Sequence, residues 1–177
     1  VVRRLQAECA LPDGYEGEVD LLLKPWIKTV AECLQQGLLL LVDYGYPRRE
    51  LYHPQRAKGS LMCHYRHRAH DDPLLWPGLQ DITSYVDFTS VAEAGVEAGL
   101  ELAGFTTQAH FLLDCGLETM LAELPADGSP AYLGKVSEAK RLILPGEMGE
   151  RFRCMGLQRA LNGQRPGLRL QDLRGRV

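Results

Sequence analysis

The sequence feature that most constrains the fold is the apolar run LLLLV at residues 38–42, which is followed directly by Asp43, Tyr44 and Gly45. A run of this length without polar alternation is typical of a strand covered on both faces, as in a parallel sheet flanked by helices. In open α/β sheets, ligands bind beyond the carboxyl ends of such strands. The run therefore predicts an α/β fold and places Asp43 where chemistry would occur.

An amphipathic helix is predicted before this strand. Apolar residues recur every four positions between residues 19 and 36: Leu22, Trp26, Val30 and Leu34. This period predicts a helix with one buried face, kinked or restarted at Pro25 and ended by Gly37.

After residue 87 the pattern alternates between helices and strands. Ser90 followed by Glu93 fits a capping box at the start of a helix. Further periodicity predicts helices at 91–99, 111–124 and 132–144, and strands at 102–107 and 151–157. The last of these strands alternates apolar and polar residues, as a half-covered edge strand does. This order of elements is half of a doubly wound sheet.

Residues 46–87 differ from the rest of the chain because they contain four prolines and four of the five histidines without sustained periodicity. We expect a long loop that covers a site or selects a substrate. Its basic residues are interpreted as a solvated face: Arg48, Arg49, Arg56, Lys58, Arg66 and Arg68. We expect the arginine-rich tail, residues 162–177, to be a flexible, solvated end.

Charge and cysteine content exclude several classes of protein. The 177 residues carry 20 basic and 23 acidic side chains, a balance that argues against a dedicated nucleic-acid binder. No apolar run approaches the roughly 20 residues of a membrane span. Five cysteines without a CxxC pair favour a reducing compartment, such as the bacterial cytoplasm. Because the chain opens at Val1 on a segment typical of the middle of a domain, we expect a fragment of a longer protein.

Two groups of residues in the long loop could carry chemistry. Cys63, His64, His67 and His70 have spacings that would bring the histidines towards one helical face, but interleaved arginines and the lack of a second ligand cluster argue against a metal site. His64 by itself is interpreted as a pocket residue.

Asp81 and Asp87 could orient a cationic nucleophile through charge-assisted hydrogen bonds. Two structural alternatives carry more weight from spacing alone. One is an Asx-type turn at Asp81, and the other is a helix N-terminal role for Asp87.

The segments DYG, PGLQDITSYVDF and PGEMGERF resemble the carboxy-terminal portion of the MidA-like S-adenosylmethionine (SAM)-dependent methyltransferases, a family that includes mitochondrial proteins assisting complex I assembly. The resemblance covers residues 11–160. It implies the carboxy-terminal half of a class I, Rossmann-like methyltransferase sheet, with an inserted loop region and extra helices. Residues 38–42 and 102–107 would be its fifth and sixth strands, and residues 151–157 its antiparallel seventh.

The resemblance also implies a cofactor and roles for individual residues. SAM would be held mainly by a glycine-rich turn upstream of this chain, with Asp43, Tyr44 and Gly45 bordering the methyl-donor site. Residues 1–161 would be a partial domain that is inactive without its other half. The acceptor would be a protein arginine, with Asp81 and Asp87 as catalytic carboxylates and His64 as a substrate-binding residue.

Two further expectations concern partners. The alternative to an enzyme is a non-catalytic assembly or interaction protein that kept the methyltransferase fold. An exposed edge at residues 38–42 would invite pairing with another chain, so we also expect a possible homodimer through this edge.

Overall fold

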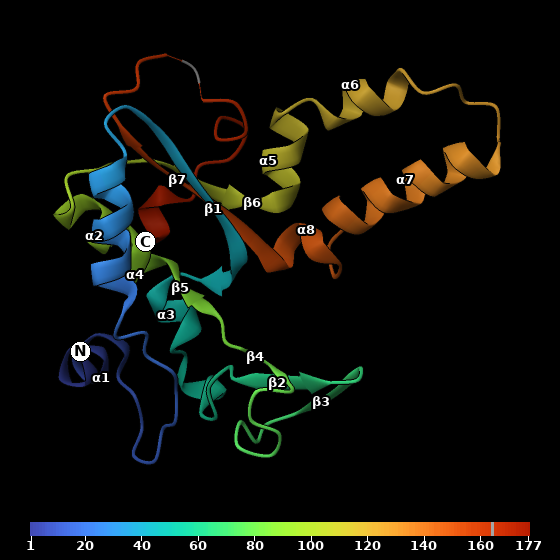
Figure 1. Ribbon diagram of the computed structural model, residues 1–177. Helices are drawn as coiled ribbons and strands as arrows, with labels where there is room; N and C mark the ends of the chain where they lie inside the picture. The colour runs from blue at the N-terminus through green and yellow to red at the C-terminus, as the bar shows by residue number, and fades with distance from the viewer. Residues whose placement is uncertain (164) are drawn as a thin grey trace.

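The computed structural model describes residues 1–163 and 165–177 (Figure 1). Within these residues, a four-stranded sheet has the order β5-β1-β7-β6. Its strands are β1 (Gly37–Tyr46), β5 (Val86–Asp87), β6 (Glu101–Thr107) and β7 (Phe152–Arg159). Helices pack against the sheet, and the predicted α/β class is confirmed.

The last strand of the sheet, β7, runs antiparallel to both of its neighbours, β1 and β6. The antiparallel strand implied by the family resemblance is therefore present. Its interpretation as an edge strand was wrong, because β7 is the strand between β1 and β6 and is buried from Cys154 to Gln158. Both faces of β7 are covered, so its burial does not alternate.

Strand β1 differs from the prediction in its length and in its burial. It continues through Asp43 to Tyr46, so Asp43 lies within the strand and not beyond it. Leu39 and Leu41 pack against the core, whereas Leu40 and Val42 are 38% and 44% exposed. The expectation of two covered faces was wrong, because the second face of β1 is left partly exposed at Leu40 and Val42. Along its outer edge, β1 pairs with β5 at Gly45 and Tyr46 alone among the described residues.

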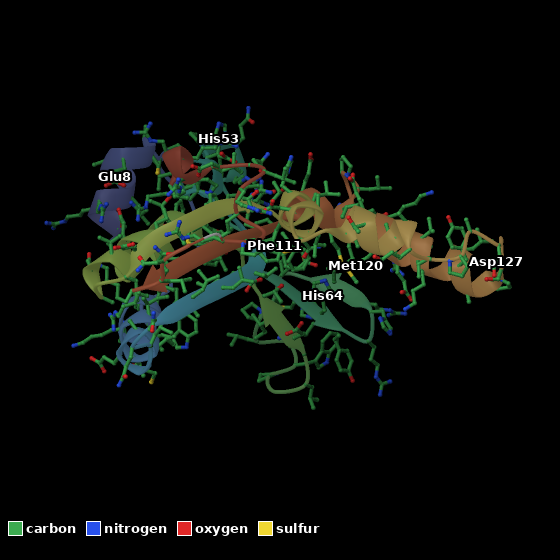
Figure 2. The ribbon with its side chains drawn as sticks, turned by 90° about the horizontal axis from the view of Figure 1, so that it is seen from above. Glu8, His53, His64, Phe111, Met120 and Asp127 are labelled. Carbon is green, nitrogen blue, oxygen red and sulfur yellow. The ribbon has the colours of Figure 1, made fainter. Side chains whose placement is uncertain are left out.

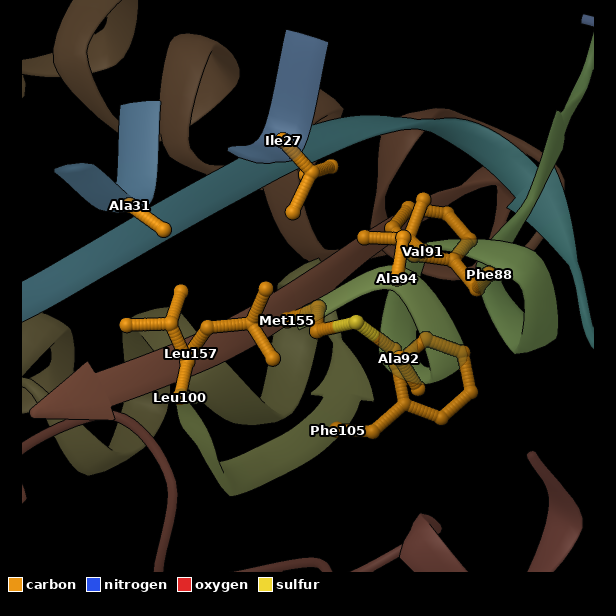
Figure 3. Close-up of a cluster of buried hydrophobic side chains, with 10 residues drawn as sticks. All are labelled: Ile27, Ala31, Phe88, Val91, Ala92, Ala94, Leu100, Phe105, Met155 and Leu157. Atoms are coloured by element: carbon orange, nitrogen blue, oxygen red, sulfur yellow. The ribbon is translucent and has the colours of Figure 1, made fainter. Parts of the chain in front are cut away.

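Helices α2 (Leu23–Cys33) and α4 (Phe88–Glu97) pack against each other over one face of the sheet. The helix predicted to be kinked or restarted at Pro25 instead begins at Leu23. Pro25 lies in its first turn, where the missing N–H costs no hydrogen bond. The N-cap of α4 is Asp87, three residues before the predicted Ser90. Figure 3 shows the core between these helices and the sheet: Ile27, Ala31, Phe88, Val91, Ala92, Ala94, Leu100, Phe105, Met155 and Leu157.

The segment expected as a long loop contains regular structure. After α3 (Arg48–Leu51) and a 3-10 turn, η1 (Pro54–Arg56), a small antiparallel sheet has the order β3-β2-β4 within the described chain. Its strands are β2 (Met62–Tyr65), β3 (Arg68–His70) and β4 (Asp81–Thr83). The expectation of a loop was therefore wrong. The sequence did not reveal these strands because they are short, and because the connection between β2 and β3 contains two residues with positive φ, Arg66 and His67.

A helical arm projects away from the sheets (Figures 1 and 2). It consists of α6 (Leu117–Ala122) and α7 (Pro130–Ile143), and Figure 2 shows Asp127 at the end of the arm, away from the body of the molecule. The predicted helix at 111–124 is divided, because Gly116 at φ 92° separates α5 (Gln108–Asp114) from α6. Helix α8 (Met148–Arg151) then leads into β7.

Both ends of the chain reach α3: α1 (Val2–Cys9) packs on it, and Arg176 near the C-terminus forms an ion pair with Glu50. Helix α1 buries Leu5 against Leu51 and Tyr52. The tail, expected to be flexible, makes specific contacts: Leu168 is buried over two strand glycines, and the Leu173 amide donates to the Phe105 carbonyl at 2.8 Å. It ends in a 3-10 turn, η2 (Arg174–Arg176).

None of the helices in the described residues combines the length and the apolar character needed to cross a bilayer. All five cysteines are free thiols. Burial raises the pKa of Cys154 to about 12, which keeps this thiol protonated and inert.

Candidate functional site

The residues expected to border the methyl donor lie near the carboxyl end of β1. Asp43 is exposed, and its Oδ1 accepts a hydrogen bond from the Tyr44 amide at 2.7 Å. Gly45 is buried because β5 and α4 approach closely. A side chain there would collide with the Val86 carbonyl and would lie 2.8 Å from the Phe88 ring. Gly45 therefore serves the packing of β1 against β5, whereas Asp43 faces solvent.

Four aromatic residues gather at this end of the sheet. The Tyr44 ring lies 3.9 Å from the Phe152 ring between centroids, and 6.3 Å from the Tyr85 ring in a stacked arrangement. Tyr46 contacts Tyr85 at 5.6 Å. Because Tyr85 immediately precedes β5, the pairing of β5 with β1 brings these rings together from distant parts of the sequence.

The guanidinium groups of two arginines lie over Tyr46. The Cζ atoms of Arg56 and Arg153 are 4.4 and 5.6 Å from the centroid of this ring. A cation within about 6 Å of an aromatic face is attracted by the ring quadrupole. The aromatic cluster therefore binds guanidinium groups within the chain itself.

A buried ion-pair network links Arg48 and Asp87, which lie near the two ends of the inserted region, residues 46–87. Arg48, expected to be solvated, has a side chain that is 8% exposed, and it donates to both carboxylate oxygens of Glu93 at 3.0 and 2.7 Å. It also contacts Asp87 at 3.3 Å, Glu8 at 3.0 Å and the Ser90 hydroxyl at 3.0 Å. The expectation of a solvated side chain was wrong for Arg48, because three acids from different elements surround it.

This network perturbs the ionisation of its members. The hydrogen bonds from Arg48 and then from Arg4 lower the pKa of Glu93 to about 2. The hydrogen bond to Glu93 raises the pKa of Arg48. Glu8 also has a lowered pKa, mainly because Arg4 donates to it. Glu8 and Glu93 are therefore ionised at neutral pH.

A cleft of about 410 Å³ opens beside the network. One wall comes from the N-terminal part of the chain, including Val19 and Asp20, and the other comes from Tyr85, Asp87 and Glu93. Its volume falls within the range of small-molecule sites, roughly 300 to 1,000 Å³.

The structure brings together two of the predicted site residues. His64 on β2 and Asp81 on β4 are directly paired across the small sheet, and both are exposed. Asp87 lies in the other sheet, on β5. Its carboxylate accepts hydrogen bonds from the Ser90 amide at 3.1 Å and the Ser90 hydroxyl at 2.7 Å. Asp87 is therefore the N-cap of α4, which is the helix N-terminal role that the sequence offered as an alternative.

The histidines do not share a helical face, because their segment folds as the β2–β3 hairpin. His64 pairs with Ala69 and Cys63 with His70, so His64 and His70 point to opposite faces of the hairpin, while His67 lies in its turn. In the described part of the chain, no group of three or more histidine, cysteine, aspartate and glutamate side chains is arranged to hold a metal ion.

Sequence reasoning missed the Arg48 network and the aromatic cluster. Both depend on pairs far apart in the chain, such as Arg48 with Glu93 and Tyr44 with Phe152. One local signal was available. Arg48 follows a strand and a proline directly, and is therefore close to the sheet end rather than in an open loop.

The chain is similar to solved structures over almost its whole length. A crystal structure of a COG1565 superfamily member from Burkholderia thailandensis, bound to S-adenosyl-homocysteine, matches 94% of this chain with 41% identity and a TM-score of 0.90. A second, native structure from the same organism matches 96% with 42% identity and a TM-score of 0.91. This chain covers 43% and 45% of those two chains.

Sequence comparison leads to the same group of proteins. The zebrafish protein named protein arginine methyltransferase NDUFAF7, mitochondrial, is 29% identical over 136 residues, which are 76% of this chain and 30% of the relative. This chain thus spans less than half the length of these relatives. The profile of the family described as "Putative S-adenosyl-L-methionine-dependent methyltransferase" matches residues 2–106. The chain therefore belongs to this family of SAM-dependent methyltransferases.

Proposed function

We propose that this chain is the acceptor-side part of a longer SAM-dependent methyltransferase that methylates arginine on a protein. The observation that carries the proposal is the similarity, at 41% identity and a TM-score of 0.90, to a structure bound to S-adenosyl-homocysteine, the product that SAM leaves after methyl transfer. The zebrafish relative, named as a protein arginine methyltransferase, supports the choice of acceptor.

The residues at the end of β1 have suitable chemistry for one side of a SAM site. The exposed carboxylate of Asp43 can accept hydrogen bonds from hydroxyl or ammonium groups. The aromatic ring of Phe152, beside Tyr44, can contact a planar base. Our proposal keeps Asp43, Tyr44 and Gly45 at the border of the methyl-donor site, with Gly45 acting through close packing.

When bound, SAM supplies an electrophilic methyl group on a sulfonium. The contribution of this chain is to position the acceptor in line and to exclude water. In our proposal the inserted region, residues 46–87, covers the site and selects the acceptor. Arg48 and Asp87 fix the two ends of this region against α4.

Carboxylates are the natural partners of an acceptor guanidinium, because they match its planar donors. We assign this role to Asp81, whose exposed carboxylate lies on the strand beside His64. His64 would contact the same acceptor. Asp87 has hydrogen-bond partners for both carboxylate oxygens, so its proposed catalytic contribution is to position β5 and α4.

Methyl transfer to a protein arginine tests the proposal directly. With a full-length methyltransferase containing this chain, we expect Asp81→Asn to reduce transfer of labelled methyl groups at least tenfold while thermal unfolding is unchanged. Asp13→Asn, in an exposed turn, is the matched control. Full activity of Asp81→Asn would remove Asp81 from the site.

Calorimetric titration with SAM separates the enzyme from a non-catalytic assembly protein of the same fold. Saturable binding by the full-length protein supports the enzyme, and absence of binding supports the alternative. We expect the 177-residue chain alone to bind SAM at least tenfold more weakly. Equal binding by both would overturn the proposal that a second half is needed.

We also propose that the chain forms a homodimer through the open edge of β1. Unpaired strand edges favour pairing with another strand, and in the 177-residue chain a second copy is the available partner. We expect a dimer in light scattering, and a strictly monomeric chain would contradict it. For the compartment, we propose the bacterial cytoplasm or, in a eukaryote, the mitochondrial matrix. Detection of the protein in the corresponding cell fraction tests this assignment.

A further inference from the structure

Three tyrosines at the carboxyl end of β1 differ in their contacts with arginine: Tyr46 is contacted by guanidinium groups of the chain, whereas Tyr44 and Tyr85 are partly exposed to solvent. Tyr46 is covered by Arg56 and Arg153. Tyr44 and Tyr85 are 41% and 38% exposed, and their rings are stacked with planes 15° from parallel. This surface therefore presents free aromatic area beside a ring on which the protein already places guanidinium groups.

We infer that Tyr44 and Tyr85 bind the guanidinium group of the acceptor arginine by stacking, an inference that rests on the proposed function. Arginine stacks on aromatic faces through a planar, weakly hydrated cation, whereas the lysine ammonium is a strongly hydrated point charge. The surface should thus distinguish arginine from lysine. Tyr46, with Arg56 at 4.4 Å, is an example of this contact within the same cluster.

The position of the two rings agrees with this role. Tyr44 lies on β1, two residues before its end, and Tyr85 leads into β5, which pairs with β1 at Gly45 and Tyr46. Ligands of α/β sheets bind at the carboxyl ends of strands. Tyr85 also lines the cleft of about 410 Å³, so a side chain stacked on Tyr85 would lie beside that cleft.

The inference predicts selective binding of arginine by the 177-residue chain without any methyl transfer. The probes are N-acetyl-arginine amide and N-acetyl-lysine amide, titrated against protein with labelled tyrosine rings in NMR spectra. We expect the arginine probe to shift the ring signals of Tyr44 and Tyr85 and the lysine probe to shift them less. Tyr85→Leu should weaken arginine binding about threefold to fivefold, whereas Tyr85→Phe, which keeps the ring, should retain it.

Tyr132→Leu on α7 is the matched control and should leave binding unchanged, because Tyr132 lies on the projecting arm. In a full-length methyltransferase, Tyr85→Leu should raise KM for an arginine peptide and leave SAM affinity unchanged. Equal shifts with the lysine probe, or unaltered arginine binding by Tyr85→Leu, would overturn the inference. Selective arginine binding by the 177-residue chain, together with no methyl transfer to arginine by the full-length protein, would support the inference and contradict the proposed function, so the two failures are distinguishable.

Discussion

Arg48 and Glu93 form a two-pronged ion pair, with Nη1 3.0 Å from Oε1 and Nη2 2.7 Å from Oε2. The pair joins α3, at the start of the inserted region, to α4, which follows its end. Asp87 contacts the same guanidinium from β5 at 3.3 Å. One buried cation therefore closes the region of about forty residues between Arg48 and Asp87 against the sheet.

Replacing Arg48 by Met should destabilise the fold by about 3 kcal/mol, because it leaves the carboxylates of Glu8, Asp87 and Glu93 clustered without their cation. The free energy of unfolding, measured in urea, checks this. Arg49→Met is the control, since Arg49 is exposed, and it should change stability by less than about 0.5 kcal/mol. Equal effects of the two substitutions would show that burial of Arg48 contributes nothing.

The stability of the chain should fall as the pH is lowered from about 4.5 towards 2. The pKa of Glu93 is about 2 in the folded protein and returns to its ordinary value of 4.5 on unfolding. A lowered carboxyl pKa stabilises the fold above the unfolded pKa, and this contribution disappears as pH falls through the folded pKa. Urea denaturation at a series of pH values measures the slope. Glu93→Gln should reduce the slope in this window, and an unchanged slope would falsify the assignment.

Gly45→Ala should destabilise the fold by about 2 kcal/mol or more, because the new methyl group would collide with the Val86 carbonyl and the Phe88 ring. Gly134→Ala is the matched control. Gly134 lies inside α7 with no atom within 4 Å of the added carbon, so alanine should stabilise this helix by about 0.5 to 1 kcal/mol. Thermal unfolding of the two variants should therefore shift in opposite directions, and a stable Gly45→Ala protein would contradict the close approach of β5.

Leu168→Ala should destabilise the fold by about 2 kcal/mol, because Leu168 is 8% exposed and packs over Gly104 and Gly156. Leu170→Ala provides the comparison, since Leu170 is 59% exposed and should be nearly neutral. Chemical denaturation distinguishes them. If both variants unfold like the parent chain, the tail behaves as the flexible end that its composition suggested.

The elements with strong local signals could be predicted from the sequence. The strand at Leu38 and its neighbours, the helix after Asp87 and the last strand at Cys154 all occur near their predicted positions. The antiparallel direction of β7 came from the family resemblance, since periodicity does not give strand direction. Errors concentrated at residues 46–87, where strands of three or four residues are too short to show a period.

The candidate site could be predicted less well than the fold. His64 and Asp81 were each selected separately, and their pairing across β2 and β4 is a property of the sheet register. Asp87 was expected either as a catalytic carboxylate or at a helix N-terminus. The structure shows the N-cap bond to Ser90, which depends on the exact start of α4. Arg48 was interpreted as solvated, because nothing nearby in the sequence reveals three distant acids.

The sequence by itself determined most of the longer helices and strands outside residues 46–87, because apolar periodicity and turn residues act locally. The tertiary structure alone decided which face of β1 stays open, where the tail packs, and that Arg48 is buried. It also decided that Tyr44, Tyr85 and Phe152 share one surface. These features depend on strand register and on contacts between residues tens of positions apart, and the energy of such contacts is not encoded in any one segment.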